Sequence, residues 1–194
     1  MSEFSLRHQI PNLLTLARIA AVPVLILFLY DGRYGAALAV FMLAGITDGL
    51  DGWIAKRFKC VTRLGSILDP LADKILIVST YVMLVLAGDL PFWLILLIGF
   101  RDLGIIAGVL VLNTLNGHVQ MQPSLLSKVN TFLQISLVIL VMVERIGFIA
   151  LEPVAEILLW FVAVTTVASA IHYVYFWFIH PLESRVEQKV ESKD

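Results

Sequence analysis

The chain has 194 residues, of which 59% are hydrophobic and only 15% are charged, and its mean hydropathy is +0.90. A soluble domain of this length does not need so large an apolar surplus, so the composition indicates an integral membrane protein. The net charge is −1, and no nucleic-acid partner is expected. The chain has one cysteine, Cys60, which excludes an internal disulfide.

Six apolar stretches are long enough to cross a membrane, because a spanning helix needs about 20 mostly apolar residues. Turn and breaker residues, among them Gly88-Asp89 and Pro123, separate these stretches. The sequence therefore predicts an all-α membrane bundle. Its six transmembrane helices are expected at 12–30, 35–56, 69–88, 91–112, 125–143 and 151–178.

Two shorter regions flank the predicted bundle. Residues 3–11 are expected to form a short interfacial helix before the first span. The membrane domain should cover 1–181, and the charged segment 182–194 should be a cytosolic tail. The first residues lack the pattern of a cleaved signal peptide, so the first span itself is expected to drive insertion.

The distribution of Lys and Arg predicts the orientation. With both termini in the cytosol, twelve of the 14 Lys and Arg residues fall towards the inside, and only Arg33 and Arg145 fall outside. This bias places the acidic cluster described next at the cytosolic boundary. The expected location is the bacterial inner membrane.

Four carboxylates lie within 26 residues of this apolar chain. Asp48 and Asp51 are three residues apart at the end of the second span, and Asp69 and Asp73 are four apart at the start of the third, so each pair shares a helical face. Carboxylates at membrane depth are costly and usually have a functional reason. Because oxygen ligands suit hard divalent ions, the cluster predicts a Mg²⁺ or Mn²⁺ site.

Two alternatives remain open for the helix position of Asp69, and a purely structural explanation has to be weighed for all four carboxylates. Asp69 precedes Pro70, so it either caps the third span or lies in a continuous, kinked helix that starts near Gly65. One Asp alone would be explained as a helix cap or as the partner of a nearby Lys or Arg. Helix stability alone does not explain four Asp residues accompanied by glycines at matching spacing, because unpaired charges at membrane depth are costly.

The spacing of the cluster resembles a known signature. Asp48-x₂-Asp51-Gly52-x₂-Ala55-Lys56-x₈-Gly65-x₃-Asp69-x₃-Asp73 is similar to the motif D-x₂-D-G-x₂-A-R-x₈-G-x₃-D-x₃-D of the CDP-alcohol phosphatidyltransferases. Seven of the eight fixed positions match. The departure is Lys56, which replaces an Arg and loses its bidentate fork, so either Lys56 or the neighbouring Arg57 supports the nucleotide phosphates.

The resemblance implies a site and a chemistry. Two divalent ions held by Asp48, Asp51, Asp69 and Asp73 would bridge the diphosphate of CDP-diacylglycerol, and Asp73 would be the general base. Gly52 and Gly65 would let the phosphates approach the backbone. The resemblance also implies a homodimer with a cytosol-facing site.

Other polar residues in apolar spans are further candidates. Arg18 either snorkels to the interface or binds a phosphate. Arg101 forms a self-compensating pair with Asp102 or contacts the substrate. Lys128 either snorkels or binds an anionic head group, and Thr47 is a candidate nucleotide contact.

The rival class is a cation transporter, because membrane carboxylates also mark ion pathways. A site at one edge of the membrane beside a basic loop suits a diphosphate with its metals better than it suits a bare cation. Within the enzyme class, segments 127–131 and 165–170 resemble the mitochondrial-type cardiolipin synthases of this family. Phosphatidylglycerol is therefore the expected acceptor, and glycerol 3-phosphate is the alternative.

Overall fold

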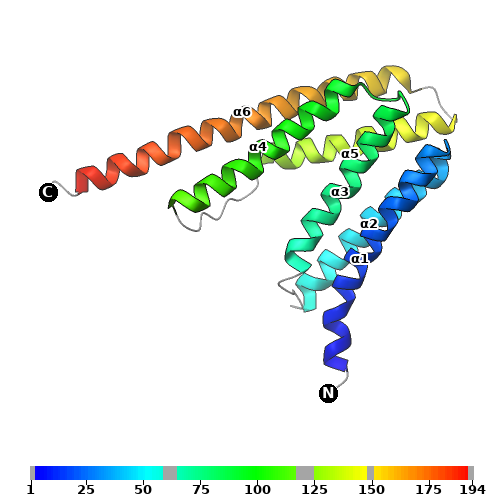
Figure 1. Cartoon of the computed structure of the whole chain (residues 1–194), viewed down its shortest axis with the longest axis horizontal. Coiled ribbons are helices and arrows are strands. Elements are labelled where there is room, and N and C mark those ends of the chain that lie inside the picture. The colour runs from blue at the N-terminus through cyan, green and yellow to red at the C-terminus, as the bar shows by residue number, and fades with distance from the viewer. Residues whose placement is uncertain (1–2, 59–64, 117–124, 148–150, 192–194) are drawn as a thin grey trace. The chain divides into compact units, whose positions relative to one another are not determined.

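The structure is a computed structural model that describes residues 3–58, 65–116, 125–147 and 151–191. Side chains are described for 15–49, 71–108, 110, 114, 125–147 and 151–175. Within the described backbone the chain forms six α-helices and no strand (Figure 1). They are α1 (Glu3–Tyr30), α2 (Tyr34–Phe58), α3 (Gly65–Leu86), α4 (Phe92–Asn116), α5 (Leu125–Ile146) and α6 (Glu152–Glu191).

The predicted all-α class is confirmed. Among the described residues, Leu125–Ile146 and Glu152–Tyr175 are long and apolar enough to cross a membrane, while Thr15–Tyr30 and Tyr34–Gly49 are apolar but shorter. The arrangement of six spans in one bilayer stays a prediction.

One predicted boundary is wrong. Residues 3–11 do not form a separate helix, because α1 continues through Pro11. Its Glu, Leu, Arg and Gln residues favour helix, and one Pro removes only one backbone hydrogen bond. The charged cytosolic tail at 182–194 stays a prediction, and α6 continues into it as far as Glu191.

The third helix decides between the two alternatives left open for Asp69. It begins at Gly65, four residues before Asp69, so Asp69 is not its cap. The continuous helix through Pro70 is the alternative that the structure confirms.

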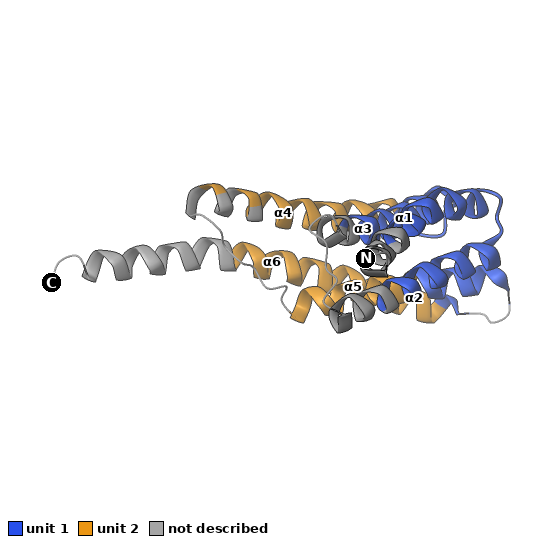
Figure 2. Cartoon of the chain, turned by 90° about the horizontal axis from the view of Figure 1, so that it is seen from below, with its two compact units in different colours: residues 1–91, 138–152 blue, residues 92–137, 153–194 orange. Residues whose placement is uncertain are grey.

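The chain divides into two compact units, which we describe separately (Figure 2). Unit 1 comprises 1–91 and 138–152, and unit 2 comprises 92–137 and 153–194. The boundary falls inside α5, so its last turns belong to unit 1.

In unit 1, α1 packs against both α2 and α3. Each helix contributes a buried stripe at spacings of three and four residues, which is the period of one helical face. Alanines in the α2 and α3 stripes let the backbones approach closely. The stripes are Thr15, Arg18, Val22, Leu25 and Leu29 in α1, Ala37, Phe41 and Ala44 in α2, and Ala72, Leu76, Thr80 and Leu84 in α3.

The other end of unit 1 is fixed by a polar cluster around Asp89. The Tyr34 hydroxyl donates a hydrogen bond of 2.6 Å to Asp89 Oδ2, and Arg145 Nε lies 2.6 Å from Asp89 Oδ1. Asp89 is almost fully buried, so these two partners satisfy a carboxylate that would otherwise be costly there. The cluster ties the α2 start and the α5 end to the turn after α3.

In unit 2, hydrogen bonds and aromatic contacts join α4, α5 and α6. Trp93 of α4 and Trp160 of α6 stack with ring centroids 5.7 Å apart. Leu94, Ile98 and Val162 are buried. A network of polar side chains, described below, lies further along the same helices.

Candidate active site

Arg18 connects the two Asp pairs of the motif in unit 1. Its Nη2 lies 2.7 Å from Asp48 Oδ1, and its Nη1 lies 3.0 Å from Asp73 Oδ1. The Arg18 side chain is fully buried, while those of Asp48 and Asp73 are 37% and 40% exposed. One guanidinium therefore holds a carboxylate from each of two helices.

The stripe pattern explains why these three side chains meet. Arg18 lies in the buried stripe of α1, three residues after Thr15. Asp48 follows Ala44 by four residues, so it extends the buried stripe of α2. Asp73 directly follows Ala72, which belongs to the buried stripe of α3. The apolar packing of unit 1 thus leads to a polar cluster at one end of its three helices.

The described part of this cluster suits a cation. Asp48 and Asp73 are the two motif carboxylates whose side chains are described, and both lie within ion-pair distance of one positive group. Carboxylate oxygens that converge from separate helices and stay partly exposed are suitable ligands for Mg²⁺ or Mn²⁺. Among the described side chains, no three metal-ligating residues come together.

Several predicted site residues have side chains outside the described part of the chain. Asp51, Gly52, Lys56 and Arg57 belong to the last turns of α2, and Asp69 belongs to α3. Gly65 is the first residue of α3. Their predicted roles stay predictions.

Thr47 makes local contacts. Its hydroxyl lies 2.9 Å from the Leu43 and Ala44 carbonyl oxygens of its own helix and donates to this backbone. A nucleotide would therefore meet the acceptor lone pairs of this hydroxyl.

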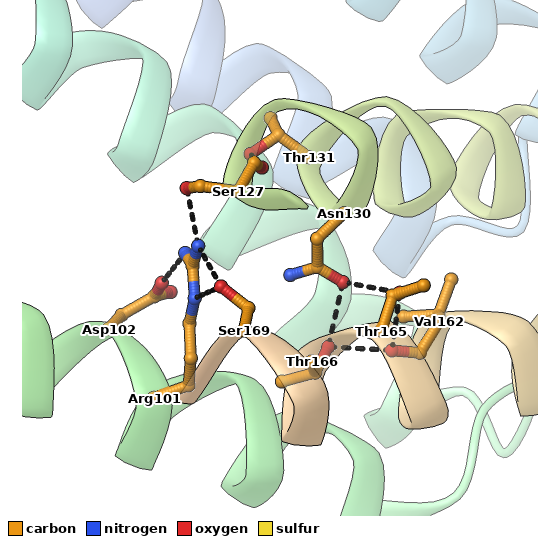
Figure 3. Close-up of polar contacts among 9 residues, drawn as sticks. All are labelled: Arg101, Asp102, Ser127, Asn130, Thr131, Val162, Thr165, Thr166 and Ser169. Carbon is orange, nitrogen blue, oxygen red and sulfur yellow. Dashed lines mark hydrogen bonds and ion pairs between the residues drawn. The ribbon is translucent and has the colours of Figure 1, made fainter. Parts of the chain in front are cut away.

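Unit 2 holds a second buried arginine, Arg101 of α4 (Figure 3). Its Nη1 lies 2.8 Å from Asp102 Oδ1, so the predicted self-compensating pair is present. Its Nε and Nη2 donate to Ser169 Oγ of α6 at 3.2 and 2.9 Å, and Nη2 also donates to Ser127 Oγ of α5. One carboxylate and two hydroxyls thus orient this guanidinium.

Asn130 makes a second set of contacts beside this arginine (Figure 3). Its Oδ1 accepts hydrogen bonds from Thr165 at 2.8 Å and from Thr166 at 2.9 Å. Asn130 and Thr166 are fully buried. Segments 127–131 and 165–170, which the sequence singled out separately, therefore pack together through their polar side chains.

A cavity of about 300 Å³ lies between α4 and α6 in unit 2. Arg101, Thr166 and Tyr173 are the lining residues whose side chains carry a polar group. The remaining lining residues are glycine or apolar. They are Leu97, Phe100, Gly104, Ile105, Val167, Ala170, Ile171 and Val174.

The sequence did not identify all of these contacts. Lys128, a predicted substrate contact, is exposed on α5. The sequence does not indicate that Ser169 is a partner of Arg101. It also does not indicate that Asn130 is a partner of Thr165 and Thr166. Arg18 was considered for a phosphate or for snorkelling, whereas the structure gives it Asp48 and Asp73 as partners. The signal was its place in the apolar stripe of α1, where a charge needs a buried partner.

Comparison with known proteins agrees with the predicted family. The family model described as CDP-alcohol phosphatidyltransferase matches residues 8–177. This range includes the whole Asp motif, both arginine clusters and the cavity of unit 2.

Similar proteins carry two different names. The chain is 38% identical over 183 residues to human cardiolipin synthase (CMP-forming), which covers 86% of the chain and 61% of that protein. It is 39% identical over 171 residues to a CDP-diacylglycerol–glycerol-3-phosphate 3-phosphatidyltransferase from Rickettsia bellii, which covers 86% of the chain and 93% of the relative. The Bacillus subtilis protein of the latter name is 32% identical, with 85% and 93% covered.

These identities do not separate the two named activities, since they differ by one percentage point between the human and Rickettsia proteins. All three names describe phospholipid synthesis from a CDP-linked lipid or with release of CMP. The family match covers far more than half of the chain, and it agrees with a motif that was recognised from its spacing alone. The chain therefore belongs to the CDP-alcohol phosphatidyltransferase family, enzymes of phospholipid biosynthesis.

Proposed function

We propose that this chain transfers a phosphatidyl group from CDP-diacylglycerol to phosphatidylglycerol, which gives cardiolipin and CMP. The acceptor hydroxyl forms a bond to the phosphorus next to the diacylglycerol, and the bond from that phosphorus to the CMP oxygen breaks. The acceptor proton passes to a carboxylate oxygen, for which we propose Asp73. Family membership favours this reaction over the rival cation transporter.

The Asp residues of α2 and α3 are proposed to hold two divalent ions at the cytosolic face of the bacterial inner membrane. The convergence of Asp48 and Asp73 on one positive group supports this assignment. A bound Mg²⁺ or Mn²⁺ would neutralise carboxylate charge and would stabilise the charge that develops on the phosphate and on the leaving oxygen. Asp51 and Asp69 complete the proposed ligand set, and Lys56, Arg57, Gly52, Gly65 and Thr47 are proposed to contact the nucleotide.

The observation that carries the acceptor assignment is the cavity of unit 2, whose lining is mostly apolar and includes Arg101. A ligand with one anionic group and an acyl chain matches both parts. Phosphatidylglycerol has this composition, whereas glycerol 3-phosphate has no apolar part.

The charge available near Arg101 agrees with a phosphodiester. Asp102 already offsets Arg101, and no other Lys or Arg occurs in the sequence between Arg101 and Lys128. The family resemblance implies that phosphatidylglycerophosphate synthases carry a second Arg eight residues after this one. The chain has Val109 at that position. A dianionic phosphomonoester would lack enough cationic side chains here, whereas a monoanionic phosphodiester needs fewer of them. We propose that Arg101 and Lys128 contact this acceptor, and that the enzyme works as a homodimer.

Removal of divalent metal should abolish CMP release. Purified protein in detergent should lose activity in excess chelator and regain it with Mg²⁺ or Mn²⁺, because the clustered carboxylates otherwise repel the diphosphate. CMP release from CDP-diacylglycerol is the measurement. Full activity in excess chelator would contradict the metal assignment.

Asp73→Asn should lower the rate of CMP release by at least about 100-fold, because the variant cannot accept the acceptor's proton. CDP-lipid binding should be largely retained. The matched control is Asp31→Asn, which removes an exposed carboxylate in the turn after α1 and should leave the rate unchanged. A near wild-type rate for Asp73→Asn would reject Asp73 as the base.

Gly104→Leu should weaken use of phosphatidylglycerol, because Gly104 lines the cavity and a Cβ added there meets no other atom within 4 Å. The longer side chain would then fill space proposed for the acyl chain. We expect kcat/KM for phosphatidylglycerol to fall about tenfold, equivalent to roughly 1.4 kcal/mol. Gly99→Leu is the control: Gly99 lies on the same helix with equal free space but does not line the cavity.

If both glycine variants respond equally, the cavity does not hold the acceptor. The acceptor itself is tested by supplying wild-type protein with phosphatidylglycerol or glycerol 3-phosphate, followed by lipid mass analysis. Efficient synthesis of phosphatidylglycerophosphate without cardiolipin would overturn the acceptor but leave the family assignment unchanged.

Ser169→Ala should disturb Arg101, because Ser169 Oγ accepts two of its hydrogen bonds in a buried site. An unpaired buried donor costs about 1–3 kcal/mol, so KM for phosphatidylglycerol should rise and thermal stability should fall. Ser136→Ala provides the control, since the Ser136 hydroxyl donates only to a carbonyl of its own helix in the described contacts. Equal effects of both changes would show that Ser169 does not position Arg101.

A further inference from the structure

Arg18 occupies the position of a cation between two carboxylates of the motif. Its guanidinium contacts Asp48 at 2.7 Å and Asp73 at 3.0 Å through separate nitrogens. The Arg18 side chain is fully buried behind the two carboxylates, which are themselves more than one-third exposed. The carboxylates are therefore accessible to an ion from solution, but both are already ion-paired with Arg18.

The charges of this cluster explain why Arg18 is needed before any metal binds. Two carboxylates and one guanidinium leave a net charge of −1, whereas the two carboxylates alone would leave −2 beside an apolar helix interface. Buried or half-buried charges without partners are strongly destabilising, and a partner from α1 removes this cost. Within the described contacts, Arg18 thus offsets part of the carboxylate charge in the metal-free protein.

The same contacts oppose a divalent ion. An ion ligated by Asp48 and Asp73 would share their oxygens with a group of like charge only a few ångströms away. Like charges at such distances repel strongly at the effective dielectric constants of protein sites. Coupling of this kind is reciprocal, so an ion that binds also weakens the ion pairs of Arg18.

We propose that Arg18 is a built-in counter-cation that competes with the divalent ion for Asp48 and Asp73. It keeps the carboxylates paired when the metal is absent and lowers the metal affinity of the empty site. The inference rests on the proposed metal dependence and assigns to Arg18 a positioning role rather than a catalytic one.

The test measures Mn²⁺ binding to the purified full-length protein without any CDP-lipid, from the free Mn²⁺ signal in electron paramagnetic resonance. Arg18→Met should bind the first Mn²⁺ at least about tenfold more tightly than the wild type, because the competing charge is gone. Its thermal stability should be lower in chelator and should rise more with Mn²⁺ than that of the wild type.

Arg145→Met is the matched control. It also removes an arginine ion-paired to an aspartate in unit 1, but this pair is the one with Asp89 at the other end of the helices. Its Mn²⁺ affinity should equal that of the wild type. A wild-type or weaker affinity of Arg18→Met would overturn the inference, since it would mean that Arg18 is neutral towards the ion or helps to bind it.

Arg18→Lys keeps the test decisive if Arg18→Met does not fold. An ammonium is a single point and cannot hold both carboxylates through separate nitrogens, so Mn²⁺ should still bind more tightly than in the wild type. An unchanged affinity in Arg18→Lys would count against the inference. Absence of Mn²⁺ binding in the wild type and in every variant would reject the metal assignment itself, whereas equal binding in all of them would reject only the role of Arg18.

Discussion

A guanidinium inside an apolar helix interface is stable only when carboxylates or other acceptors reach it, and this requirement organises unit 1. Arg18 lies in the buried stripe of α1, and its two carboxylate partners come from α2 and α3. The packing of alanines and aliphatic residues brings the helices together, but the ion pairs fix which ends align. Asp48 and Asp73 of the motif are therefore held in place by a residue outside the motif.

The two buried arginines create different environments because their partners differ. In the described contacts, Arg18 pairs with two carboxylates, and these three groups together carry a net negative charge, which suits cations. Arg101 has one carboxylate and two serine hydroxyls, so its surroundings are close to neutral and depend on hydrogen bonds. A donor lipid that carries a diphosphate with metals and an acceptor that carries a single phosphodiester would need these two kinds of site.

The sequence predicted the helices and the acidic motif because both depend on local patterns. Long apolar runs indicate helices, and the spacing of Asp48, Asp51, Asp69 and Asp73 identifies the family independently of any contact. The Arg101–Asp102 pair could be predicted because the two residues are neighbours in sequence. The carboxylate partners of Arg18 and the serine partners of Arg101 could not, since they lie 26 to 68 positions away and depend on how helix faces rotate. The start of α3 was ambiguous because Pro70 fits both a first turn and a tolerated interior position.

The cavity of unit 2 has an apolar rim that is open at its sides, since Phe100 is 73% and Ile171 is 63% exposed. With the predicted six-span arrangement, a ligand that enters this groove sideways would come from the surrounding bilayer and would not pass through water. Its occupancy then follows the mole fraction of that lipid in the membrane rather than its amount per volume of solution. Dilution of the acceptor with inert lipid at constant total acceptor should therefore slow the enzyme, in the manner of a reaction confined to two dimensions.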